Sequence, residues 1–265
     1  MKNYHDNHEW ISAGLLKKFV RSPLKAKTAM DQPSEQSEAL TLGSCFHEMM
    51  ESPDEFYSFT VFNNDDRPEP DKTFGSKLNK QWKESIYLDN DLVISSDQYE
   101  TLKLMVESLK RSQFYKSLIG QKLESIEEGY YTEFGNNKAK CKPDALYNGA
   151  DDSIICVDWK TTAESLTASP GHMTYIIRKL GYDIQAVHYT EVLKNVLNKD
   201  VHFFFVFVEK TAPFEVVPVY INPQGELYNE TFEKWNIALS EVNECFKTGV
   251  WPTLESKLTN KIITL

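Results

Sequence analysis

The stretch that decides the fold runs Lys142-Pro143-Asp144 and then, after a turn, Asp158-Trp159-Lys160. Between these two segments lie the turn-rich residues 147–152 and the apolar run Ile154-Ile155-Cys156-Val157. The pattern predicts a β-hairpin, with Asp144 near the start of one strand and Asp158 near the end of the next. Because side chains alternate along a strand, Asp158 and Lys160 should project from the same face. Two carboxylates and an ammonium group are therefore expected at one edge of a sheet.

This set of side chains suits the metal-assisted hydrolysis of a phosphodiester. Carboxylate oxygens are preferred ligands of Mg²⁺, and a lysine beside them can act on the attacking water or on the phosphate. The alternative interpretation is a solvated strand end that happens to read Asp-x-Lys. The apolar run before Asp158 argues against it, because it indicates a strand buried on both faces. In α/β proteins such strands end at the cleft that binds the ligand.

Length and charge limit the choice of function. The chain has 265 residues, enough for one large domain or two small ones, and a net charge of −10. An acidic protein is not an obvious partner for nucleic acid, whose binding depends on lysine and arginine. The basic residues are nevertheless clustered within residues 1–30, at Lys138, Lys140 and Lys142, and at Arg178 and Lys179. Local basic patches on an acidic exterior can still hold a phosphate backbone.

Cysteine spacing and hydropathy exclude other classes. The four cysteines form no Cys-x-x-Cys pair, which disfavours zinc ribbons and iron–sulfur clusters, and Cys156 is expected to pack in the core. No stretch approaches the ~18 apolar residues of a membrane span. The residues that follow Met1 lack the apolar segment of a secretory signal. We therefore expect a cytoplasmic protein without disulfides and without a membrane segment.

The periodicity of the chain predicts an α/β fold with a mixed central sheet flanked by helices. A single domain is expected over residues 1–265, with a helical part at about 1–120, a catalytic core at about 121–221 and a C-terminal helix at about 226–248. Ser95-x-x-Gln98 is a capping box for a long helix. Other expected elements are helices at about 37–51 and 182–197, strands at 130–134, 201–208 and 213–221, and a loop at 63–77.

In this setting the hairpin resembles the catalytic motif of the PD-(D/E)xK nuclease superfamily, which has a restriction-endonuclease-like core. Gly43-x-x-x-His47 before it and Gln185-x-x-x-Tyr189 after it are similar to motifs of the RecB-like branch. Further segments resemble the phage-type exodeoxyribonuclease VIII (RecE-like) group, and the resemblance extends from about Tyr4 to Trp251. These segments include Ile11-Ser12-x-Gly14-Leu15, Ser22-Pro23, Pro53-x-x-Phe56, Gly181-Tyr182-Asp183 and Phe205-Val206-Phe207-Val208. Lys142 departs from the pattern, since arginine is common at that position.

The resemblance implies metal ligation by His47, Asp144, Asp158 and the Trp159 carbonyl, with orientation of a water as the alternative role of His47. It implies that Lys160 positions or deprotonates the attacking water or stabilises the transition state. Gln185 and Tyr189 lie one helical turn apart, and they would hold the metal-bound water, the scissile phosphate or Lys160. An acid from the preceding strand is also expected, and we favour Glu128 among Glu124, Glu127, Glu128 and Glu133.

The activity implied is that of a Mg²⁺-dependent exodeoxyribonuclease, with Mn²⁺ as a substitute, that degrades linear double-stranded DNA from its ends. The implied polarity is 5′→3′, which leaves 3′ single strands for a single-strand annealing protein. A homo-oligomeric ring, phage or prophage origin and a place in the bacterial cytoplasm are further expectations. The alternatives are a RecB-like endonuclease or single-strand exonuclease, and a catalytically silent module that binds DNA ends or a recombinase. The intact Asp144, Asp158 and Lys160 disfavour the silent module.

Overall fold

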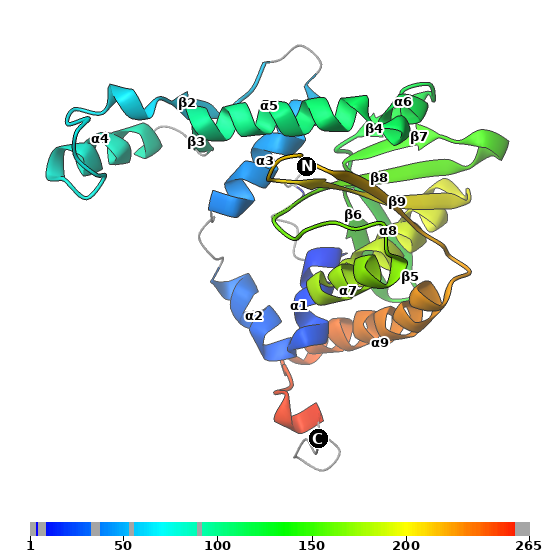
Figure 1. Ribbon diagram of the computed structural model, residues 1–265. Coiled ribbons are helices and arrows are strands. Elements are labelled where there is room, and N and C mark those ends of the chain that lie inside the picture. Colours follow the sequence, from blue (N-terminus) through cyan, green and yellow to red (C-terminus); the bar gives the residue numbers. More distant parts are fainter. Residues whose placement is uncertain (1–3, 5–8, 33–37, 53–55, 89–91, 258–265) are drawn as a thin grey trace.

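A mixed five-stranded sheet forms the centre of the computed structural model, which describes residues 4, 9–32, 38–52, 56–88 and 92–257 (Figure 1). The strand order is β10-β9-β8-β7-β4, with β8 and β9 parallel and the other neighbours antiparallel. The predicted fold class, an α/β fold with a mixed central sheet, is confirmed. The strands are β4 (Leu123–Ile126), β7 (Ala145–Asn148), β8 (Ile154–Thr162), β9 (Val201–Glu209) and β10 (Val216–Ile221).

The predicted hairpin is formed by β7 and β8, and Asp144 directly precedes β7. The prediction that Asp158 lies near the end of its strand is wrong, because Asp158 lies in the middle of β8. The pairing of β7 with β8 stops at Ala145 opposite Val157, whereas β9 pairs with β8 as far as Thr162. From Asp158 onward, β8 therefore has a neighbour on the β9 side only. This open edge is where the site is built.

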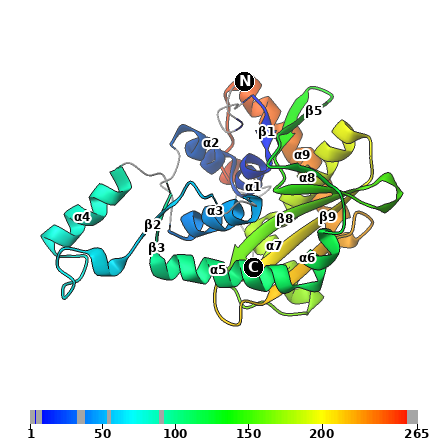
Figure 2. The same cartoon turned by 90° about the horizontal axis from the view of Figure 1, so that it is seen from above.

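Helices cover both faces of the sheet (Figure 2). On one face, α3 (Glu38–Glu51), α5 (Ser96–Arg111) and α6 (Gln113–Leu118) pack with Val157 and Trp159 of β8. The core of the other face contains Cys156 and is covered by α1 (Ala13–Arg21), α7 (Pro170–Leu180), α8 (Tyr182–Leu197) and α9 (Glu226–Thr248). Alternate residues of β8 thus enter different cores, as strand geometry requires. Trp159 lies in the core that α3, α5 and α6 cover, whereas the alternation of β8 places Asp158 on the face of Cys156.

The hairpin of β5 (Tyr130–Phe134) and β6 (Asn137–Cys141) does not join the central sheet, contrary to our expectation of one sheet. It pairs instead with the short β1 (Ile11–Ser12) in a separate three-stranded sheet. The position of the outer strand of the central sheet is taken by β4, which the sequence did not predict. Its residues are mostly exposed, so β4 has no apolar run by which it could be recognised.

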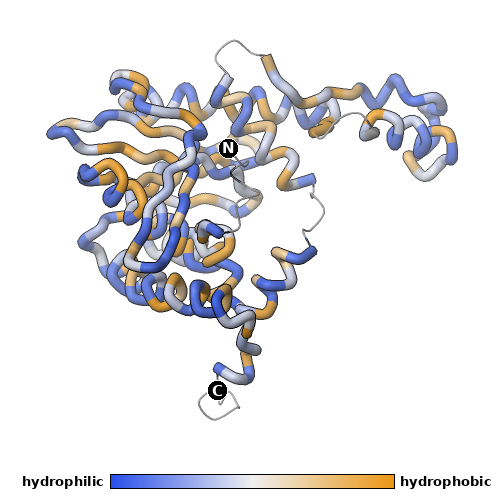
Figure 3. The backbone as a smooth tube through the Cα atoms, turned by 180° about the vertical axis from the view of Figure 1, so that it is seen from behind, coloured by the Kyte–Doolittle hydropathy of each residue, from blue (hydrophilic) through white to orange (hydrophobic). Residues whose placement is uncertain are grey.

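Residues 60–88 and 92–95 project from the main body (Figures 1 and 2). Here β2 (Thr60–Phe62) pairs with β3 (Val93–Ser95), and α4 (Lys77–Leu88) follows the predicted loop. The remaining helix, α2 (Pro23–Asp31), follows α1, and the predicted capping box opens α5. Hydrophobic positions concentrate along the central strands and on the inner sides of the helices (Figure 3).

The four cysteines are free and buried, in line with the packing role expected of Cys156. Among the described residues, no helix combines the length and the apolar character needed to cross a bilayer.

Candidate active site

A cleft of about 1010 Å³ opens between α3 and the distal part of β8. The helix α3 forms one wall through Gly43, His47 and Glu51, among others. The second half of β8 forms another wall, and Glu127 and Tyr182 also line the cleft. His47 on α3 and Lys160 on β8 therefore line the same space, although they come from distant parts of the chain.

Asp158 and Lys160 lie on the same face of β8 and form an ion pair between Lys160 Nζ and Asp158 Oδ1. The Nε2 atom of Gln185, on α8, donates a hydrogen bond to Asp158 Oδ2. Asp158 is only 1% exposed, so both contacts act where water screens them little. Burial raises the pKa of Asp158 to about 6, even though the Lys160 ammonium favours its charged form.

Asp144, which directly precedes β7, contacts residues of both walls of the cleft. Its Oδ2 accepts a hydrogen bond of 2.6 Å from the backbone N–H of Trp159, and it lies 3.3 Å from His47 Nδ1. Burial opposes the charge of Asp144, but His47 outweighs it, and the pKa of Asp144 stays below its ordinary value. For His47, burial lowers the pKa, and Asp144 more than compensates by raising it to about 9. The two groups therefore form an ion pair in the absence of a bound cation.

The open edge of β8 also orients the carbonyl group of Trp159. In a strand, the N–H and C=O of one residue point to the same side, since paired residues exchange both hydrogen bonds. The N–H of Trp159 bonds Asp144 and not β9. The Trp159 carbonyl therefore faces the side of β8 that β7 leaves free. This direction agrees with the expected use of that carbonyl as a ligand.

Two glutamates join His47 in a cluster whose ligand atoms lie within 4.8 Å of one another. These glutamates are Glu51, one turn further along α3, and Glu127, between β4 and β5. Glu127 also forms an ion pair with Lys142, the residue that replaces the usual arginine. Burial, together with the charges of Glu127 and Asp144, raises the pKa of Glu51 to about 8.

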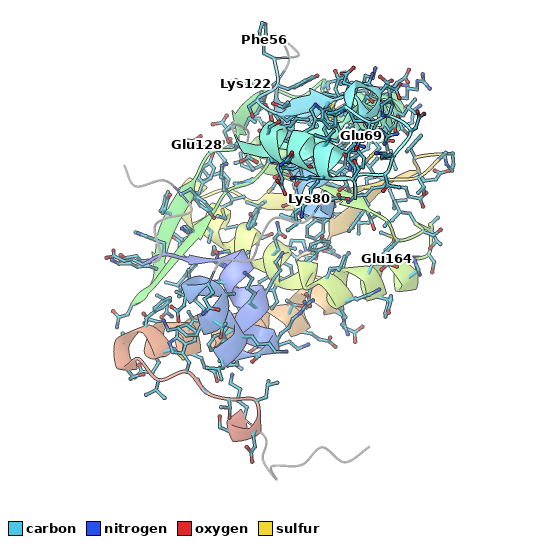
Figure 4. All side chains as sticks on the ribbon, turned by 90° about the vertical axis from the view of Figure 1, so that its left-hand side faces the viewer. Phe56, Glu69, Lys80, Lys122, Glu128 and Glu164 are labelled. Atoms are coloured by element: carbon cyan, nitrogen blue, oxygen red, sulfur yellow. The ribbon has the colours of Figure 1, made fainter. Side chains whose placement is uncertain are left out.

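The cluster corrects our choice among the four glutamates of residues 124–133. The structure brings Glu127 to the site and leaves Glu128 outside it: the side chain of Glu128 is exposed, and it accepts a hydrogen bond of 3.3 Å from Tyr130 (Figure 4). Glu127 has a positive φ of 49°, so the chain turns sharply there and neighbouring side chains diverge. Spacing in the sequence does not reveal such a turn, which is why the two residues were not separated.

Gln185 and Tyr189 share a face of α8 but contact different groups. Gln185 bonds Asp158, whereas the Tyr189 hydroxyl donates a hydrogen bond of 3.2 Å to the carbonyl of Lys142. Tyr189 thus supports the backbone that leads into Asp144. The structure shows no contact of Tyr189 with Lys160, which was one of its expected partners.

Lys160 keeps its charge in this setting. Burial lowers the pKa of Lys160, but Asp158 and Asp144 outweigh burial and hold it above its ordinary value. The ammonium group lies 5.2 Å from the centre of the Tyr182 ring, a favourable cation–π distance. A permanently charged lysine is a better electrostatic stabiliser than a base, which favours stabilisation of the transition state among the roles that the resemblance implies.

Three functional or supporting residues were missed in the sequence. Glu51 follows His47 at the i, i+4 spacing of a helix face, a signal that was available. His188 is fully buried between the carbonyl of Lys140, at 2.9 Å, and the Trp235 indole N–H, at 3.0 Å. Lys17 donates a hydrogen bond to Gln185. His188 falls within the segment 181–189 that carries the resemblance, but no pattern assigned a role to it or to Lys17.

The donor set fits a divalent cation such as Mg²⁺ or Mn²⁺. Carboxylates of Asp144, Asp158, Glu51 and Glu127 gather with one imidazole, and these are ligands suited to such ions. Asp158 Oδ1 is buried and accepts no hydrogen bond from the described residues, although it contacts Lys160 as an ion pair.

Comparison with known proteins gave a family and a fold. The model of the family described as "PDDEXK-like domain of unknown function (DUF3799)" matches residues 12–259. A comparison with curated proteins gave no match. The crystal structure of a "Putative exonuclease" from Eubacterium rectale is 14% identical, covers 96% of this chain and 89% of that one, and has a TM-score of 0.62. A "phage related exonuclease" from Haemophilus somnus 129PT is 13% identical, with coverages of 91% and 96% and a TM-score of 0.36.

Proposed function

The chain belongs to the PDDEXK-like domain family that its residues 12–259 match, and on this premise we propose that it is a metal-dependent exodeoxyribonuclease. The predicted relationship to the PD-(D/E)xK superfamily is confirmed by this match. The observation that carries the proposal is that Asp144 and Asp158 lie beside Lys160 and His47, which line the cleft. Asp144, Asp158 and Lys160 are intact and are held by specific contacts, as catalysis requires and a silent binding module does not.

The proposed metal is Mg²⁺, with Mn²⁺ as a substitute. Asp144, Asp158 and the Trp159 carbonyl would hold it, together with His47, and Glu51 and Glu127 lie beside them as further carboxylates. When bound, the ion would activate water and neutralise charge on the phosphate. The imidazole of His47 is better suited to Mn²⁺ than to Mg²⁺.

The side chains of the protein contribute orientation and charge. Lys160 places a permanent positive charge beside Asp158, where it stabilises the negative charge that develops on the attacked phosphate. Gln185 fixes one oxygen of Asp158, and the N–H of Trp159 fixes Asp144. The site is therefore preorganised by contacts from α8 and from the backbone of β8.

The proposed substrate is linear double-stranded DNA, degraded 5′→3′ from its ends. This part of the proposal rests on the resemblance of the motifs to the RecE-like group. The product would be a 3′ single strand suited to a single-strand annealing protein, and a homo-oligomeric ring would retain the DNA. These partners follow from the resemblance alone.

The test uses linear duplex DNA labelled at one end and then at the other, with Mg²⁺, Mn²⁺ or EDTA. We expect metal-dependent loss of nucleotides from the 5′ ends, and no loss with Lys160→Ala. The matched control is Lys122→Ala, which removes an exposed lysine outside the cleft (Figure 4). Failure of the wild-type protein to degrade DNA with either metal would overturn the proposal. Cleavage of supercoiled circles would favour an endonuclease instead.

A further inference from the structure

Lys17 is joined to the predicted site by one hydrogen bond. It lies on α1, and its Nζ donates to Gln185 Oε1 at 3.1 Å. The other end of the same amide, Gln185 Nε2, donates to Asp158 Oδ2. A continuous chain of hydrogen bonds therefore runs from α1 through α8 to the carboxylate of β8.

The chemistry of the two end groups fixes the orientation of the amide. A lysine ammonium only donates hydrogen bonds, and an ionised carboxylate only accepts them. Gln185 must therefore turn its oxygen toward Lys17 and its nitrogen toward Asp158. Gln185 is 6% exposed, so water cannot readily replace either partner. Without Lys17, the buried Oε1 would lose a donor, and the amide would lose the contact that holds it in this rotation.

The environment of Lys17 indicates that its position is specified. Its aliphatic stem passes over Gly181, where an added β-carbon would lie 3.4 Å from Lys17 Cγ. Its Nζ lies 5.1 Å from the centre of the Tyr182 ring, which Lys160 approaches at 5.2 Å. Burial, together with the charge of Lys160, lowers the pKa of Lys17 to about 8. Lys17 is thus a cation at neutral pH despite an unfavourable location.

We propose that Lys17 is a positioning residue: through Gln185 it holds the Asp158 carboxylate in the orientation that binds the divalent metal. This inference rests on the proposed function, because it concerns the same metal site. Lys17 itself touches neither the metal ligands nor the substrate in this role. Its effect is transmitted by the amide of Gln185, and the loss of Gln185 should therefore abolish it.

A purely electrostatic influence of Lys17 predicts the opposite result. Removing a positive charge near a cation site should strengthen metal binding, because it removes repulsion. Removing a group that orients a ligand should weaken metal binding, typically by 10- to 100-fold for such outer partners. The sign of the change in metal affinity therefore separates the two interpretations.

The experiment measures Mn²⁺ affinity of the full-length protein by isothermal titration calorimetry. The variant Lys17→Met keeps the apolar stem and removes the donor, and we expect the dissociation constant to rise about tenfold. Lys17→Arg keeps a donor and should recover most of the affinity. Lys18→Met, on the exposed side of the same helix, is the matched control and should leave Mn²⁺ affinity unchanged. Thermal unfolding in EDTA checks that each variant is folded.

A double-mutant cycle tests the route through the amide. In a Gln185→Met background, Lys17→Met should cause no further loss of Mn²⁺ affinity. If Lys17→Met does not fold, Lys17→Leu, which also lacks a donor, takes its place in the cycle. In the nuclease assay, Lys17→Met should lower kcat while the KM for DNA stays unchanged.

Unchanged or tighter Mn²⁺ binding by Lys17→Met, in a protein whose wild type binds Mn²⁺ and cuts DNA, would overturn the role of Lys17 alone. A loss of affinity that persists undiminished in the Gln185→Met background would also overturn it. A wild-type protein that binds no Mn²⁺ would instead overturn the proposed function.

Discussion

Asp144 accepts a hydrogen bond of 2.6 Å from the backbone N–H of Trp159, at the point where β7 stops pairing with β8. The carboxylate thereby takes the place of a strand neighbour and satisfies a backbone donor at an otherwise open edge. The bond needs only an acceptor oxygen, whereas metal binding needs the negative charge. The structural and the chemical roles of Asp144 can therefore be separated by substitution.

Asp144→Asn should abolish activity while preserving the fold. The amide oxygen can still accept from Trp159, but the charge that would hold the metal and pair with His47 is lost. Loss of an outer partner of a metal ligand already costs about 10- to 100-fold, so we expect a fall of more than about 100-fold for a ligand itself. End-labelled duplex degradation measures the activity, and circular dichroism on heating measures the fold.

Asp151→Asn is the matched control, since this exposed aspartate lies in the turn of the same hairpin. It should leave activity unchanged. An Asp144→Asn protein that remains folded and degrades DNA at the wild-type rate would rule out Asp144 as a ligand.

The sequence predicted the elements whose burial is one-sided or complete. Strong signals came from the apolar runs of β8 and β9 and from the 3.6-residue periodicity of α9. These patterns are clear because the residues that must be buried in the core are apolar. The helix α7 was missed, since its start at Pro170 resembles a turn in sequence although proline is favourable in the first turn of a helix. The division of the strands into two sheets was also missed. Periodicity indicates which residues of a strand are buried, but it does not indicate which other strand pairs with it.

The candidate site was predictable where the chemistry is concentrated in a motif. Asp144, Asp158 and Lys160 follow from the hairpin and strand alternation, and Gln185 lies at the site, although its contact with Asp158 was not among the partners expected for it. Lys17 was beyond reach, because 168 positions separate it from Gln185 in the chain. The choice between Glu127 and Glu128 depended on one backbone turn with positive φ, which no side-chain pattern encodes.

The two adjacent glutamates provide a paired test of the site. Glu127→Gln should weaken Mn²⁺ binding by about 10-fold or more, because a carboxylate of the cluster with His47 and Glu51 is neutralised. Glu128→Gln should have no effect, since Glu128 is exposed and the amide still accepts from Tyr130. Calorimetric titration with Mn²⁺ measures both variants. A larger effect from Glu128→Gln would reverse the assignment.

Tyr189→Phe should act on stability more than on chemistry. It removes only the hydroxyl that bonds the Lys142 carbonyl, a partly buried hydrogen bond worth about 1 kcal/mol of unfolding free energy. Urea unfolding measures this loss. Activity should fall only a few-fold, because Tyr189 contacts the backbone that leads into Asp144 and does not contact the Asp144 carboxylate itself. Tyr175→Phe, at an exposed tyrosine, should change neither quantity. A fall in activity as large as that of Lys160→Ala would show that the hydroxyl contacts the reaction directly.

His188 should make the stability of the protein depend on pH in the acidic range. The Trp235 N–H donates to Nδ1 and the Nε2–H donates to the Lys140 carbonyl, so the buried ring is neutral and has no site for a second proton. Burial lowers the pKa of His188 from 6.5 to about 4. Between these values the unfolded chain binds a proton that the folded protein does not. The free energy of unfolding is therefore fully retained above pH 6.5, and it falls as the pH drops toward 4, by about 3 kcal/mol.

His188→Gln isolates this contribution, because glutamine offers one donor and one acceptor to the same partners but does not titrate. Carboxylates that titrate in the same range affect the free energy of unfolding of both proteins equally. Their contribution therefore cancels when the wild type is compared with the variant. Urea unfolding of the wild type and the variant, measured from pH 7 to pH 4, should give curves that converge or cross as the wild type loses the additional free energy. Parallel curves would mean that the ring is protonated in the folded protein, which the hydrogen bond from Trp235 to Nδ1 does not allow.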